Sequence, residues 1–203
     1  MYRIAIAALI ACIVGLPVLK ADDVKQIDPE HLKPISKLLL EETAKLKELP
    51  VKVAHDPEHG VGIEGEKRHL MVVPDAKLTA ESIAAVKGNV LPVGTLFLNR
   101  VTIVVAGEGL AQDKHRTVEI AAKNEKVTVK VMQMAIAKVE GQLVLLVYAG
   151  GTTPALVTPL VEVKESQAAP VALDGRTADN KGIELVLTLH GRYRATIPVG
   201  PQD

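Results

Sequence analysis

Nearly all of residues 91 to 200 reads as short strands: some runs are rich in β-branched residues, as in 94–109, and others alternate between apolar and polar positions, as in 116–131. A period of two is typical of β-strands with one buried face. Polar turns separate neighbouring runs, as at Glu140–Gly141 and His190–Gly191. Strands at such short spacing, with no helices alternating between them, predict an antiparallel β-sandwich-like or open-barrel domain. The most polar stretch, residues 166–182, is predicted to be an exposed loop.

Two segments have helical patterns instead. In the first, residues 28–49, Asp28 is suited to cap a helix, and Pro34 interrupts the pattern, so the main helix is predicted from Pro34 to Leu49. This N-terminal amphipathic helix is predicted to pack on the protein's own sheet; docking on a partner or a membrane surface is the alternative. The second is a short helix at residues 79–88. The predicted apolar stripe of the first helix consists of Ile35, Leu38, Leu39, Leu46 and Leu49.

The first 21 residues have the layout of a secretory signal peptide. Arg3 precedes an apolar stretch, and Ala21 offers a small residue for cleavage. The sequence therefore predicts export to the periplasm or the extracellular space. An uncleaved N-terminal anchor is one alternative, and a lipid anchor on Cys12, within the lipobox-like "LIAC", is another.

If the chain is cleaved after Ala21, the mature protein begins at Asp22 and is predicted to have two parts. Residues 22–50 are predicted to form a helical segment that packs on a single β-rich domain, residues 51–203. The mature chain is predicted to have no transmembrane span. It would also lose Cys12, the only cysteine, and with it any disulfide or thiol nucleophile.

Charge and aromatic content exclude several functions. The 24 basic and 24 acidic residues balance, so no nucleic-acid or anionic-lipid partner is predicted. With no tryptophan, one phenylalanine and three tyrosines, the chain lacks the aromatic faces on which sugars and bases stack. The core must consist of aliphatic side chains, with Met132 and Met134 filling gaps.

Histidines cluster in "HDPEHGVGIEGEKRH", residues 55–69. Asp56 and Pro57 predict a type I turn, between flanking segments expected to form a hairpin. Imidazole and thioether groups suit zinc or copper, and the candidate ligands are His55, His59, His69 and Met71. The alternative interpretation is a polar hairpin with incidental histidines.

The segment "HGRYR" offers a second candidate site. Arg192 and Arg194 are expected to share one strand face, where they could bind an anion or contact a partner, while Tyr193 points into the core. The alternative is an exposed strand whose arginines pair with nearby acids.

No catalytic motif is present: none of Ser36, Ser82 and Ser166 lies in a G-x-S-x-G elbow, and no phosphate-binding loop occurs. We therefore predict an exported, non-catalytic β-rich protein without a cofactor. It would have a binding or structural role in the periplasm or envelope, with a protein or envelope partner. The alternative is an extracytoplasmic zinc- or copper-binding protein, and the third hypothesis is a hydrolase without a recognisable motif.

Overall fold

The computed structural model describes residues 24–65, 68–122, 125–177 and 183–202. The predicted signal peptide, its cleavage site and Cys12 lie outside the described residues. Within the described part of the chain, no helix is both long and apolar enough to cross a membrane.

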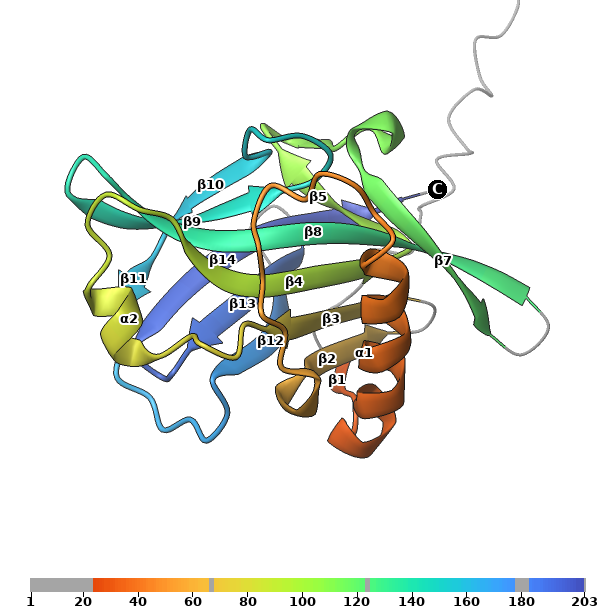
Figure 1. Ribbon diagram of the computed structural model, residues 1–203, viewed down its shortest axis with the longest axis horizontal. Coiled ribbons are helices and arrows are strands. Elements are labelled where there is room, and N and C mark those ends of the chain that lie inside the picture. The colour runs from red at the N-terminus through yellow and green to blue at the C-terminus, as the bar shows by residue number, and fades with distance from the viewer. Residues whose placement is uncertain (1–23, 66–67, 123–124, 178–182, 203) are drawn as a thin grey trace, which may run out of the picture.

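The protein is mainly β, and its strands pair antiparallel in two sheets (Figure 1). Two α-helices and two short 3₁₀-helices complete the described elements. In chain order these are β1 (Lys25–Gln26), α1 (Pro29–Thr43), η2 (Pro57–His59), β2 (Val61–Gly65), β3 (Arg68–Pro74), α2 (Ala80–Ala84), β4 (Leu91–Asn99), β5 (Val101–Val105), β6 (Glu108–Gly109), η3 (Gln112–Lys114), β7 (Arg116–Ala122), β8 (Glu125–Val139), β9 (Gln142–Tyr148), β10 (Leu156–Pro159), β11 (Val161–Glu162), β12 (Val171–Thr177), β13 (Ile183–Leu189) and β14 (Tyr193–Pro201).

The larger sheet has the order β1-β2-β3-β4-β8-β9-β10. Its longest strand, β8, pairs with β4 on one side and with β7 and β9 on the other. Because β7 pairs with the first part of β8, their hairpin projects past the end of β4, beside α1 (Figure 1).

The smaller sheet has the order β12-β13-β14-β5-β6, with β11 on β14. A continuous aliphatic core joins inward side chains of both sheets, such as Leu96 and Met132 of the larger with Leu185 and Ile197 of the smaller. Met134 belongs to the same core, so both methionines of "MQM" fill it as predicted. Burying these aliphatic chains is the main favourable term for a fold with so few aromatics.

Helix α1 differs from the predicted helix at both ends. Asp28 caps it by accepting a hydrogen bond from Glu30 N at 2.8 Å, and the helix continues through Pro34 instead of beginning there. It ends at Thr43, not Leu49. The buried face also differs from the predicted stripe, because Ile35 and Leu38 are 41% and 37% exposed. The side chains buried against the sheet are Leu32, Ser36, Leu39 and Thr43.

Helix α2 begins as predicted, with Thr79 and Ser82 forming a reciprocal capping box, but it ends at Ala84. The expected exposed loop 166–182 is partly wrong, since β12 runs from Val171 to Thr177 and pairs with β13. This segment forms a strand although its sequence is polar, because Val171 and Leu173 are buried in the core.

Arg100 separates β4 from β5. Its φ of +58° turns the chain between β4 and β5, which lie in different sheets. A left-handed backbone is unfavourable for a residue with a Cβ atom, so surrounding contacts must hold this turn. The two-residue turn predicted at Glu140–Gly141 is confirmed, with both residues at positive φ.

Candidate functional site

An apolar groove lies between α1 and the outer face of the larger sheet. Its volume is about 490 Å³, within the range of small-molecule binding sites. The projecting β7–β8 hairpin contributes three of the lining residues, Ile120, Val127 and Val129. Nine lining residues are apolar and three are polar: Ile27, Leu32, Ile35, Leu39, Met71, Phe97, Ile120, Val127 and Val129, then His69, Asn99 and Arg100.

The pleat of the sheet explains why these side chains meet. On β3, His69 and Met71 are two residues apart and therefore face the same side, and the same holds for Phe97 and Asn99 on β4. The intervening residues, such as Leu70, point into the core between the sheets. The outward side chains form a second apolar cluster beneath α1, and the groove lies beside it. The buried members of this cluster are Leu32, Leu39, Met71, Val73, Phe97, Val118, Val129 and Val131.

The three polar lining residues gather at one end of the groove. His69 and Asn99 are directly paired across β3 and β4, and Arg100 follows Asn99. Asn99 Nδ2 donates to Thr128 O at 3.2 Å, and His69 Nε2 lies 3.9 Å from a carboxylate oxygen of Glu64. Among the described residues, the exposed Arg100 guanidinium has no hydrogen-bond or ion-pair partner.

A smaller pocket of about 290 Å³ lies at the C-terminal end of α1. Its lining includes residues of the segment that connects α1 to η2. His55 and Gln133 are its polar lining residues nearest the sheet. Gln133 Oε1 accepts from Val51 N at 2.8 Å, while its buried Nε2 has no partner among the described residues. Such an unpaired buried donor fits an ordered water molecule.

His55 is held by polar contacts that fix this connecting segment. Its Nε2 lies 2.7 Å from Thr95 Oγ1, and burial lowers its pKa, although the nearby Asp75 carboxylate opposes the shift. Asp75 accepts hydrogen bonds from two main-chain amides, Ala54 N at 2.7 Å and Lys77 N at 2.8 Å. A hydroxyl beside an imidazole resembles a nucleophile with its base. Thr95 is completely buried, however, so its hydroxyl does not face a substrate in this conformation.

The four predicted metal ligands do not lie at one place. His55 forms a β-bridge with Asp75, just after the end of β3, whereas His69 lies near the start of that strand. Asp75 and His69 are six positions apart in the chain, which corresponds to roughly 20 Å of strand. Met71 is buried beneath α1, where its sulfur accepts a hydrogen bond from Ser36 Oγ at 3.5 Å. In the described part of the chain, no three His, Cys, Asp or Glu side chains are arranged to hold a metal ion.

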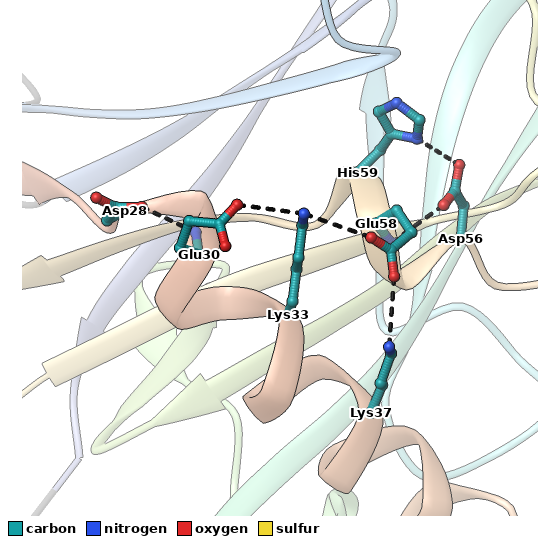
Figure 2. A network of polar contacts seen from close by, with 7 residues as sticks. All are labelled: Asp28, Glu30, Lys33, Lys37, Asp56, Glu58 and His59. Atoms are coloured by element: carbon teal, nitrogen blue, oxygen red, sulfur yellow. Dashed lines mark hydrogen bonds and ion pairs between the residues drawn. The ribbon is translucent and has the colours of Figure 1, made fainter.

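The remaining histidine, His59, belongs to a polar network that joins η2 to α1 (Figure 2). His59 Nδ1 lies 2.6 Å from Asp56 Oδ2, and the predicted turn is present, with His59 N donating to Asp56 O at 3.3 Å. Glu58 contacts Lys33 at 3.5 Å and Lys37 at 3.4 Å. The Glu58 carboxylate thus links η2 to two side chains of α1.

The predicted hairpin around this turn is wrong. Residues 51–54 form no strand, and β2 pairs with β1 and β3 instead. A pattern of alternating residues does not specify which strands pair, because that choice depends on contacts distant in sequence.

The two arginines of "HGRYR" have different surroundings. Arg192 is exposed in the turn before β14, while Arg194, on β14, forms an ion pair with Glu165. Tyr193 is buried in the core, as predicted. The pairing of Arg194 matches the alternative interpretation for that residue, and anion or partner contact by the two arginines stays a prediction.

Sequence reasoning missed Arg100, Gln133 and Lys130. Lys130 is buried, and the alternation along β8 gave a signal, since it occupies an inward position between outward Val129 and Val131. For Arg100 the only sequence signal was the polar dipeptide Asn99–Arg100 in the middle of an apolar run. Gln133, between two core methionines, gave no signal that a pocket covers it.

The function of this chain must be inferred from the geometry described above, because comparisons with known proteins identified no relative. No family model matches the chain, and no curated protein or solved structure is significantly similar to it.

Proposed function

We propose that this chain is an exported, non-catalytic binding protein whose ligand is a small apolar molecule held in the groove beneath α1. The observation that carries the proposal is the groove itself, with its nine apolar lining residues. An apolar cavity of this size with a few convergent polar groups is the usual form of a small-molecule site. A binding role in the periplasm or envelope is the function also predicted from the sequence.

The packing around the groove supports this role. Leu32 and Leu39 are buried against the sheet, while Ile35 on the same helix is 41% exposed and lines the groove. An apolar side chain that remains accessible beside a cavity gains free energy when a ligand removes it from water. The groove floor is part of a hydrogen-bonded sheet, because Met71 and Phe97 are directly paired on adjacent strands.

The finer fold assignment is part of the proposal. In it, the two sheets form a sandwich-like domain and α1 acts as the predicted N-terminal amphipathic helix that covers one face. The shared aliphatic core of the two sheets supports the first element, and the four buried side chains of α1 support the second.

Binding is tested with a neutral fluorescent apolar probe, such as N-phenyl-1-naphthylamine, titrated into the folded protein. Ile35→Trp narrows the groove and should weaken the binding of the probe. Leu38→Trp is the matched control, because Leu38 is similarly exposed on α1 but does not line the groove. Equal effects of the two variants, or no saturable binding by the unaltered protein, would reject this function.

Export is tested separately, by fractionation of cells that express the full chain. N-terminal sequencing of the exported protein should begin at Asp22. Retention of the full chain in the cytoplasm would contradict export without affecting the evidence for the groove.

A further inference from the structure

We infer that the ligand of the groove is a monomeric anionic amphiphile, with an aliphatic chain between α1 and the β7–β8 hairpin and a carboxylate on the Arg100 guanidinium. This inference rests on the proposed function, because it names the ligand of the same groove. Its basis is the uneven distribution of polar and apolar groups along the lining.

The polar end is a single row across the sheet. Direct pairing aligns Lys25 with Glu64, Glu64 with His69, and His69 with Asn99. Arg100 follows Asn99 in the chain, in the turn that leaves β4, and lines the same groove. The next residues along β3 and β4 on the same face, Met71 and Phe97, are already apolar and buried. A ligand that fits this lining has one polar end only.

The polar groups at this end of the groove place an anionic head on Arg100. Glu64 lies 3.9 Å from His69 and would repel a carboxylate on that side of the histidine. Asn99 Nδ2 is already bonded to Thr128 O. Arg100 remains, and its guanidinium, which has no partner in the described part of the chain, matches a carboxylate in shape and charge.

The backbone of Arg100 supports this placement. The residue keeps a φ of +58°, and its carbonyl accepts a hydrogen bond from Gln202 N at 3.3 Å. Glycine or asparagine adopts this conformation at lower cost. Unlike glycine or asparagine, an arginine at this position places a guanidinium with five N–H donors at the polar end of the groove.

The rest of the lining selects the body of the ligand. Phe97 is the single aromatic side chain among the twelve lining residues, and it lies in the floor. The walls consist of aliphatic groups, namely Ile35 on α1 and Ile120 and Val127 on the hairpin. Aliphatic walls favour a hydrocarbon chain over a ring system that needs stacking partners.

The test compares three probes with the same chain and different heads: dodecanoate, dodecanol and dodecylamine, titrated calorimetrically as monomers into the isolated protein. Dodecanoate should bind most tightly. Arg100→Gln should weaken the binding of dodecanoate roughly tenfold and leave that of dodecanol unchanged, because only the charged head uses the guanidinium. Arg100→Lys should retain part of the preference.

Arg192→Gln is the matched control for the loss of charge, since Arg192 is an exposed turn arginine outside the groove. Circular dichroism of each variant verifies folding. Equal affinities for dodecanoate and dodecanol, unaffected by Arg100→Gln, would overturn the inference and leave the proposed function intact. Failure of all three probes to bind would overturn both. A dimer in sedimentation that Ile35→Trp dissociates would also overturn both, because the groove would then hold a second copy.

Discussion

Lys130 donates a hydrogen bond from its buried Nζ to the main-chain carbonyl of Val101, at 2.5 Å. The contact joins β8 to the first residue of β5, immediately after the chain leaves the larger sheet at Arg100. Lys130 forms no ion pair with any described residue, and burial lowers its pKa to about 8. The turn that presents Arg100 therefore lies beside a lysine whose charge is costly to bury.

This cost predicts a pH-dependent stability. Between the folded pKa of about 8 and the ordinary value of 10.5, the unfolded state binds more protons than the folded state, so the free energy of unfolding rises with pH. The expected gain is about 3 kcal/mol over this pH range. Urea denaturation at several pH values should show this rise in the unaltered protein and not in Lys130→Met. Parallel curves for the two proteins would contradict it.

His55 predicts a second pH effect, on the acidic side. Its pKa is lowered by burial, so the unfolded state takes up a proton before the folded state does as the pH falls below 6.5. Stability therefore decreases over that range. His55→Gln, which retains a polar group near Thr95, should flatten the decrease. His59→Gln, on the exposed η2 turn, serves as the control and should leave it unchanged.

Gly94 is expected to tolerate no side chain. It is buried in β4 at a φ of +153°, beside the bulge after Pro92, and an added Cβ would meet Val73 O of β3. Gly94→Ala should lower the free energy of unfolding by about 2 to 4 kcal/mol, measured by thermal or urea denaturation. In Gly88→Ala the added Cβ meets no atom within 4 Å, so the change should stay within about 0.5 kcal/mol. Similar losses in the two variants would contradict this account.

The structure also leads to a prediction about metal binding by His55 and His69. Because His55 and His69 lie near opposite ends of β3, they should not ligate one ion. In calorimetric titrations with zinc and with copper, His55→Ala and His69→Ala should therefore have independent effects, additive in the double variant. Tight one-to-one binding that either single substitution abolishes would instead show a shared site and a different arrangement of the chain.

The amino-acid sequence determined the local features of this protein. Strand alternation, the Glu140–Gly141 turn, the Asp28 cap, the start of the helix at residue 79 and the inward direction of Tyr193 each depend on residues close in sequence. Periodicity and turn chemistry report such local preferences directly.

Only the tertiary structure decided which segments meet. The pairing of β2 with β3, the burial of β12 and the placement of α1 over the larger sheet join residues far apart in the chain. The groove and its polar end exist only after His69, Asn99 and the β7–β8 hairpin come together. The hydrophobic effect drives this assembly, but it is non-directional and does not specify which apolar faces pack together. Which strands and helices meet therefore depends on the fit of all the apolar faces of the chain.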